Sequence, residues 1–403
     1  MQGASAGKPI VVVGAGSTGS STAYHLAKAG QRVVLVDRGQ IANGTTSRSS
    51  AVVRTHYSNE VVARMALYSR DVLKDFSSVG ESGFNRTGML ILAPPEIRET
   101  VLGNIAMLNG IGARNDFMEI PEAMEAFPEF NYDDIGFAVL EPESGYADPV
   151  GVANSYARSA ERQGAQLLLG TEVSRLKAPS GTVESVELSD GSQIECSKVM
   201  LCTNVWTNEL LARSGVAPDR FLPIWAVGHP MVAFNRPASY HGNRPVVWDY
   251  PQKTYYKPEG RYLVYVGTVD SALDQRHSDP AQVSQDVGSE TLESFTGALV
   301  TRMPLMAEGV LHSTYVGMYD VTPDQHPIID ELSELGLSGV FCCAGLSGHG
   351  FKLSPALGLM NAEMVMGETG IFGRTFDRSI FALSRFKEGK EMRAKYPGMA
   401  AVA

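Results

Sequence analysis

The first residues in this sequence whose types and spacing suit a binding site form a run of small residues, Gly14-Ala-Gly16-Ser-Thr-Gly19. In a turn between a strand and a helix, glycines at this spacing allow a tight bend, close approach of the backbone to a pyrophosphate and close helix packing. Such a turn also points N–H groups and the positive end of a helix dipole at the phosphates. We therefore expect phosphate binding here, with Ser17 among the contacts.

The elements around this run decide its meaning, because glycine-rich turns alone are common. Residues 9–13 predict a strand buried on both faces, 17–28 predict a helix, and 32–37 predict a second strand. Asp37 ends that strand about 18 residues after the last glycine, near the spacing at which a carboxylate binds an adenosine ribose. The sequence therefore predicts a dinucleotide site, for FAD or NAD, that includes Asp37 and Arg38. The alternative is a structural glycine turn with a solvated aspartate.

A hydroxyl-rich segment follows the second predicted strand, over residues 44–54. Its position beside the expected nucleotide lets hydroxyls and backbone amides hold a second phosphate or the ring system, whereas a solvated loop is the alternative. Two further predicted strands, 167–173 and 198–203, end near the same expected ligand. The contacts expected from these three segments are Thr45, Thr46, Ser47, Ser49, Ser50, Val173, Thr203 and Trp206.

A second glycine loop lies near the C-terminus, Gly345-Leu-Ser347-Gly348-His349-Gly350-Phe-Lys352. It follows a predicted strand over 339–344. Ser354 and Pro355 predict the start of a helix, since a hydroxyl cap and a proline favour that position. Flexible backbone, a lysine and a helix N-terminus together favour a bound anion. Such an end could stabilise negative charge on a reduced flavin.

Length and composition limit the classes of protein that fit. With 403 residues, the chain is long enough for two domains. A net charge of −10 and the lack of a basic stripe argue against nucleic-acid binding. No apolar run approaches a membrane span, and the four cysteines lack metal-site spacing. We therefore predict no membrane or metal site and a cytoplasmic protein.

The middle of the chain has a different sequence pattern from the segments before it. From 221 to 317 it consists of strand-like pieces rich in aromatic residues, which predict a separate domain, and 254–267 predict a hairpin. A pocket could be walled by its aromatic residues, although ordinary sheet packing is the alternative for each of them; these are Trp225, Trp248, Tyr250, Tyr255 and Tyr256. Earlier in the chain, 84–92 predict a strand pair.

Three stretches together resemble the D-amino acid oxidase superfamily of FAD-dependent oxidoreductases: the first glycine loop with Asp37, the segment 44–54, and 319–352. The chain is most similar to monomeric sarcosine oxidase and glycine oxidase-like enzymes, because Pro323-Asp-Gln-His-Pro-Ile-Ile-Asp330 and Ser347-Gly-His-Gly-Phe-Lys352 look like their C-terminal signature. The resemblance implies FAD rather than NAD. It also implies an α/β fold with a Rossmann-like FAD-binding domain assembled from discontinuous segments, 1–84, 145–220 and 315–403, plus an α+β substrate domain with a mostly antiparallel sheet, 85–144 and 221–314.

The resemblance also implies roles for individual residues. Arg54 and Lys352 match the positions that bind a substrate carboxylate, and a guanidinium fork with an ammonium suits that task. For Arg54, a surface or phosphate-contacting role is the alternative. Tyr319 matches a substrate-pocket tyrosine, and His349 lies in the loop near the flavin. Gly317 replaces the cysteine that tethers flavin in those enzymes, so we expect non-covalent FAD. The lysine that assists reaction with oxygen has no secure counterpart, since the alignment admits Tyr255, Tyr256 or Lys257.

The activity that the resemblance implies is FAD-dependent oxidation of the C–N bond of an amino acid or N-alkyl amino acid. A neutral amine would pass hydride to flavin N5, water would hydrolyse the imine, and O2 or another acceptor would reoxidise the flavin. Positioning and charge stabilisation would carry most of the rate without a strong side-chain base. The alternatives are an FAD-binding dehydrogenase or non-catalytic subunit of a larger amine-oxidising complex.

Overall fold

The computed structural model describes residues 7–240, 244–273 and 275–392 of the chain. A six-stranded sheet carries the first glycine loop, and its strand order is β18-β19-β12-β1-β2-β8. All neighbouring strands are parallel except β18 against β19, which agrees with the branched, buried residues of β1. The strands are β1 (Ile10–Val13), β2 (Val33–Asp37), β8 (Gln166–Leu169), β12 (Lys198–Leu201), β18 (Ile328–Glu331) and β19 (Val340–Ala344).

Both faces of this sheet are covered, which explains why every residue of β1 is buried. Because side chains alternate along a strand, Ile10 and Val12 point to one layer and Val11 and Val13 to the other. The first layer consists of helices α1 (Ser17–Lys28), α5 (Pro149–Arg162) and α8 (Gly350–Met366), with α2 (Glu60–Lys74) packed against α8. The second consists of a small sheet, β9 (Val173–Lys177), β10 (Ser185–Leu188) and β11 (Gln193–Glu195), and helix α6 (Thr207–Arg213).

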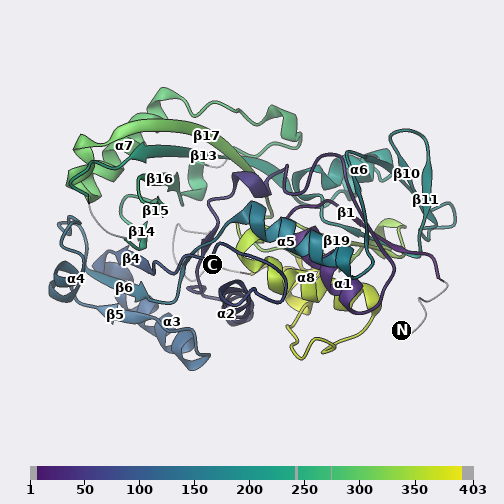
Figure 1. Ribbon diagram of the computed structural model, residues 1–403, viewed down its shortest axis with the longest axis horizontal. Coiled ribbons are helices and arrows are strands. Elements are labelled where there is room, and N and C mark those ends of the chain that lie inside the picture. The colour runs from purple at the N-terminus through teal and green to yellow at the C-terminus, as the bar shows by residue number, and fades with distance from the viewer. Residues whose placement is uncertain (1–6, 241–243, 274, 393–403) are drawn as a thin grey trace.

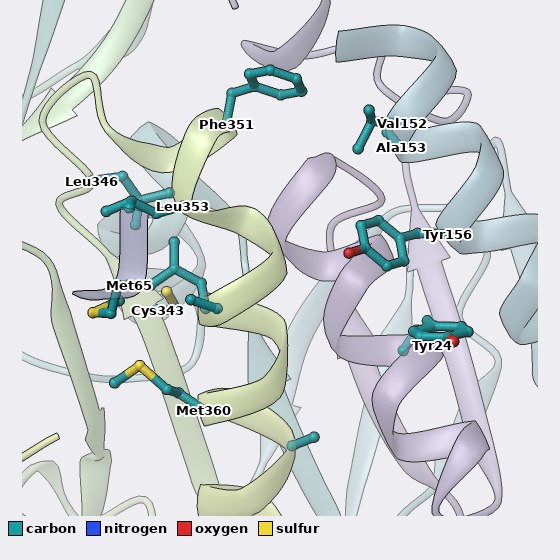
Figure 2. Close-up of a cluster of buried hydrophobic side chains, with 14 of the residues drawn as sticks. Tyr24, Met65, Val152, Ala153, Tyr156, Cys343, Leu346, Phe351, Leu353 and Met360 are labelled. Atoms are coloured by element: carbon teal, nitrogen blue, oxygen red, sulfur yellow. The ribbon is translucent and has the colours of Figure 1, made fainter. Parts of the chain in front are cut away.

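The helical layer joins distant parts of the chain, as Figure 2 shows. Tyr24 of α1 lies against Tyr156 of α5, with their ring centroids 5.3 Å apart. Helix α8 approaches α1 closely because Gly358 has no side chain; a Cβ there would lie 2.1 Å from Ser21 Oγ. Since β1 and β19 are both parallel to β12, the loops that lead from them into α1 and α8 lie at the same edge of the sheet. Both glycine loops are therefore brought together.

A second sheet of eight strands lies beside the first (Figure 1), in the order β17-β13-β16-β15-β14-β4-β6-β5. Only β14 and β4 pair in parallel, so the sheet is mostly antiparallel, as predicted. It is accompanied by helices α3 (Arg98–Gly110), α4 (Ile120–Ala126) and α7 (Ser289–Arg302). The strands are β4 (Met89–Ala93), β5 (Asp116–Met118), β6 (Phe137–Glu141), β13 (Trp225–Asn235), β14 (Val246–Asp249), β15 (Thr254–Glu259), β16 (Leu263–Thr268) and β17 (Val310–Val321).

Two predicted elements are wrong. Residues 84–92 do not form a strand pair, because β4 alone is a strand there and its partners β6 and β14 come from distant parts of the chain. The last long helix, α8, begins at Gly350 rather than at Ser354, and Pro355 lies inside it. Pro355 has no N–H, so it cannot donate the helical hydrogen bond to the carbonyl oxygen of Phe351. Lys352 consequently lies in the first turn of α8.

The predicted hairpin over 254–267 is confirmed as β15 and β16. Strand β17 runs continuously through the predicted domain boundary between 314 and 315, and the domain limits stay a prediction. In the part of the chain that the structure describes, no helix has both the length and the apolar character needed to cross a bilayer.

Candidate active site between the two sheets

The glycines of the first loop meet different steric demands. Gly14 has a φ of +104°, and a Cβ on it would lie 2.4 Å from the carbonyl oxygen of Cys202. A Cβ on Gly19 would lie 1.8 Å from the carbonyl oxygen of Gly14, so only glycine lets α1 begin against the loop. Gly16 borders a cavity, where a Cβ would lie 3.0 Å from Thr46 Oγ1. The loop therefore has the open backbone that a phosphate cradle needs.

One end of the cavity lies where β1 and β2 end. Asp37 accepts hydrogen bonds from the N–H groups of Ala15 at 2.6 Å and Gly39 at 2.7 Å, which fix its carboxylate at the end of β2. The guanidinium carbon of Arg38 lies 4.4 Å from the ring centroid of Trp206. The predicted contacts on this wall are Gly14, Gly16, Asp37, Arg38, Thr45, Thr46, Val173, Thr203 and Trp206.

The cavity continues toward the eight-stranded sheet, and the two parts share walls at Gly16, Thr45, Thr46 and Asn204. The predicted residues on the inner wall also include Ser17, Gly19, Ser49, Ser50, Arg54, Tyr319, Ser347, Gly348, His349, Gly350 and Lys352. This elongated shape fits FAD. Asp37 would hold the ribose, the first glycine loop would hold the pyrophosphate, and the inner part would hold the ring system.

The second glycine loop is anchored by Asp320, a fully buried carboxylate at the end of β17. It accepts hydrogen bonds from the N–H groups of Gly345 and Leu346 and from Asn204 Nδ2, the last at 2.8 Å. Burial raises the pKa of Asp320 to about 6, although these donors oppose the shift. Three wall residues near it, Asn204, Gln325 and Ser347, have positive φ angles of 50°, 58° and 47°. Left-handed backbone at non-glycine residues is costly and clusters at functional sites.

Removing this anchor should release the loop. We expect Asp320→Ala to lower the free energy of unfolding by about 2–4 kcal/mol, because it leaves buried N–H groups without an acceptor. FAD affinity should fall with it, since the loop lines the cavity. Chemical denaturation and FAD titration of the apoprotein measure both effects. Asp75→Ala, which removes an exposed carboxylate, is the control, and equal effects of the two substitutions would contradict the anchoring role.

The two residues expected to bind a carboxylate, Arg54 and Lys352, line the inner cavity from opposite parts of the sequence, and Arg48 is a third cationic residue on its wall. The Arg54 guanidinium is buried, and its carbon lies 5.0 Å from the ring centroid of Trp248. Lys352 Nζ donates to the carbonyl oxygen of Gly348 at 3.1 Å. Burial, and secondly the charge of Arg54, lower the pKa of Lys352 well below its ordinary value. An anion bound here would offset both causes.

Arg48 and Asp270 also line the inner cavity, whereas the imidazoles there are neutral near pH 7. His229 Nε2 lies 3.0 Å from the hydroxyl of Tyr255, and burial lowers the pKa of His229 to about 4. The pKa of His349 is lowered well below its ordinary value by burial and by the charges of Lys352 and Arg54. The ring of Tyr319 lies 5.5 Å from that of His229. The site therefore combines the cations Arg48, Arg54 and Lys352 and the carboxylate of Asp270 with uncharged imidazoles and phenols.

Four predicted residues do not lie on this cavity. Alternation along β15 points Tyr256 to the opposite face, where its hydroxyl donates to Asp249 and to the carbonyl oxygen of Ala298. Lys257 pairs with Glu259 and lines a neighbouring cavity, as does Ser47. The backbone of Gly345 is bound to Asp320 instead. Of the three residues that the alignment admitted, Tyr255 is the one on the inner wall.

Several wall residues carried no sequence signal of their own. Met89, Val246, His229 and Gln325 line the inner cavity. The first three lie on strands of the second sheet, where alternation shows that every other residue shares a face but not which face meets a ligand. Gln325 is recognisable only by its positive φ.

Comparison with known proteins agrees with this geometry. Residues 9–364 match the model of the DAO family, described as FAD dependent oxidoreductase. Mitochondrial sarcosine dehydrogenase of Homo sapiens is 25% identical over 89% of this chain, which spans only 39% of that protein. Sarcosine oxidase subunit beta of Rhodobacter capsulatus is 27% identical, over 94% of this chain and 89% of its own length. The crystal structure of L-proline dehydrogenase from P. horikoshii has a TM-score of 0.85 and 26% identity, over 96% of this chain and 99% of that chain.

The family match spans most of the chain and includes both glycine loops and the walls of the cavity. It confirms the resemblance drawn from the sequence, the fold class and FAD as the cofactor. The chain belongs to the DAO family of FAD-dependent oxidoreductases.

Proposed function

We propose that this protein oxidises the C–N bond of an amino acid or N-alkyl amino acid whose carboxylate is bound by Arg54 and Lys352. The observation that carries the proposal is the presence of both cations on the inner cavity wall, at the end opposite Asp37. Bound FAD supplies the acceptor for the hydride that leaves the carbon next to nitrogen. A guanidinium fork and an ammonium fix a carboxylate in one orientation, and so place that carbon.

The remaining walls support binding without acid–base chemistry. Met89, Trp248 and Tyr255 give the cavity an apolar and aromatic side, which excludes water from the substrate. His229 and His349 hold no charge near neutral pH because burial lowers the pKa of each. In this proposal, Arg54 and Lys352 are the cations that orient the substrate carboxylate. A substrate amine must then reach the site already neutral.

A second candidate is an FAD-bearing dehydrogenase subunit, or a non-catalytic one, in a larger amine-oxidising complex. The similarity to a protein named as a beta subunit, over 94% of this chain, favours keeping this candidate. It predicts slow reaction with oxygen after purification, whereas an oxidase releases hydrogen peroxide directly. A non-catalytic subunit predicts FAD binding without loss of flavin colour.

The decisive experiment mixes the FAD-loaded protein without oxygen with D-, L- and N-methyl amino acids and with amines that lack a carboxylate. Loss of flavin absorbance with one class of amino acid supports the proposal and identifies that class. Air is then admitted and peroxide is measured, which separates oxidase from dehydrogenase. Absorbance that no amine changes would reject catalysis on C–N bonds.

The charge of Lys352 should appear in the pH dependence of anion binding. Because the pKa of Lys352 is lowered, its ammonium loses the proton at a lower pH than an exposed lysine does. Acetate affinity should be constant below that pKa and fall about tenfold per pH unit above it, as binding requires the protonated form. Flavin absorbance changes on acetate titration report the Kd. Lys352→Met should give a weak, flat profile, and an unchanged slope in that variant would assign the titration to another group.

A further inference from the structure

The segment that carries Arg54 is fixed from behind by a buried carboxylate. Glu141, which is 1% exposed, accepts hydrogen bonds from the N–H of Thr55 at 2.7 Å and from its hydroxyl at 2.6 Å. A third hydrogen bond comes from the hydroxyl of Ser144 at 2.8 Å. These contacts fix the backbone on the C-terminal side of Arg54. They do not touch its guanidinium group.

The guanidinium group donates a hydrogen bond to the carbonyl oxygen of His56, and it also packs on two aromatic rings, of which Tyr57 is the closer. Its carbon lies 4.0 Å from the ring centroid of Tyr57, closer than the 5.0 Å to Trp248. Tyr57 is fully buried, so the ring forms a floor beneath Arg54 rather than part of the cavity wall. Stacking of this kind restricts a guanidinium to one plane.

The same tyrosine also reaches the helix that carries Lys352. Its hydroxyl lies 3.0 Å from Nδ1 of His349, and the two ring centroids are 5.4 Å apart. His349 occupies the N-cap position of α8, and Lys352 lies in the first turn of that helix. One buried side chain therefore contacts Arg54 through its ring and the Lys352 helix through its hydroxyl.

We propose that Tyr57 is a positioning residue that sets the separation of Arg54 and Lys352 and thereby the preference of the site for a carboxylate. This inference rests on the proposed function. Two like charges that share a cavity repel each other, so a rigid link between their carriers is needed to keep both aimed at one anion. The Tyr57–His349 hydrogen bond is such a link, because it joins the segment after β3 (Val52–Val53) to the start of α8.

The test removes the hydroxyl and keeps the ring. Tyr57→Phe in the FAD-loaded protein should raise the Kd of acetate about 5- to 10-fold, the loss expected for one buried hydrogen bond. The KM of a carboxylate substrate should rise by the same factor with kcat within about twofold, because no group that touches the substrate is removed. Binding of acetamide, the neutral analogue, should not change. Tyr132→Phe is the matched control, since that hydroxyl donates to the carbonyl oxygens of Ala123 and Phe127, away from the cavity.

A second pair of variants tests the Tyr57–His349 hydrogen bond by changing His349. These variants also keep the inference testable if Tyr57→Phe does not fold. His349→Asn keeps a polar partner near the position of Nδ1, so adding Tyr57→Phe to His349→Asn should weaken acetate binding further. His349→Leu should weaken acetate binding, and adding Tyr57→Phe to it should cause no further loss. Additive losses, or equal weakening of acetate and acetamide, would overturn the inference. If Lys352→Met raises the KM of acids more than that of neutral amines while Tyr57→Phe changes neither, only this inference fails. If neither variant affects acids more than neutral amines, the proposed function fails.

Discussion

Lys352→Met is expected to raise the KM for a carboxylate-bearing amine about 10- to 100-fold, since a hydrogen bond to a charged group contributes about 1.5–3 kcal/mol. The effect should be confined to acids. Lys352 lines the inner cavity from the first turn of α8, where its ammonium donates to the carbonyl oxygen of Gly348 and, in the proposed function, shares a bound carboxylate with Arg54. Methionine keeps much of the length of the side chain, so the packing of the wall changes little. Steady-state kinetics with an amino acid and the matched amide measure the difference.

The matched control is Lys257→Met. Lys257 is also a buried lysine on the cavity side of the second sheet, but its ammonium pairs with Glu259 and lies 4.6 Å from the ring centroid of Tyr146. Its loss should change stability rather than selectivity between acid and amide. Equal increases in KM for the acid and its amide in Lys352→Met would reject the carboxylate role. If Lys257→Met instead raised the KM for the acid and not for the amide, the anion site would have to be assigned to the neighbouring cavity.

The features that could be predicted from the sequence are those fixed by local backbone chemistry. The first glycine loop, α1 and Asp37 follow from glycines, a buried strand and an acid at set spacings, and each occurs where predicted. These patterns succeed because a few neighbouring residues determine the conformation.

The features that could not be predicted depend on which strands meet. Strand β4 pairs with β14, more than a hundred residues later, and only that pairing places Met89 beside Val246 on the cavity wall. Tyr256 and Lys257 were ambiguous for the same reason, because one residue of shift along β15 reverses the face. The start of α8 was misplaced because a proline usually begins a helix, whereas here the helix begins at Gly350, within the glycine loop.

The largest structural effect is expected at Gly19. In Gly19→Ala the new Cβ would lie 1.8 Å from the carbonyl oxygen of Gly14 and 3.2 Å from Cys202 Cβ. The first contact is with backbone, which no side-chain rotation relieves, so the start of α1 must move away from the loop. We expect the free energy of unfolding to fall by about 3 kcal/mol, which is at the upper end of the usual cost of overpacking a core. The purified protein should lack the colour of bound flavin.

The control uses the same substitution where the helix has room. Gly103 lies inside α3 and is exposed, and a Cβ on it would meet no heavy atom within 4 Å. Gly103→Ala should therefore stabilise the protein by about 0.5–1 kcal/mol and leave its FAD content unchanged. Flavin absorbance per mole of protein and thermal unfolding are measured for both variants. A yellow Gly19→Ala protein with the parent's FAD affinity would show that α1 can shift without opening the cradle. The pyrophosphate would then have to be bound by the hydroxyls of 44–54 rather than by the N-terminus of α1, because both border the same cavity.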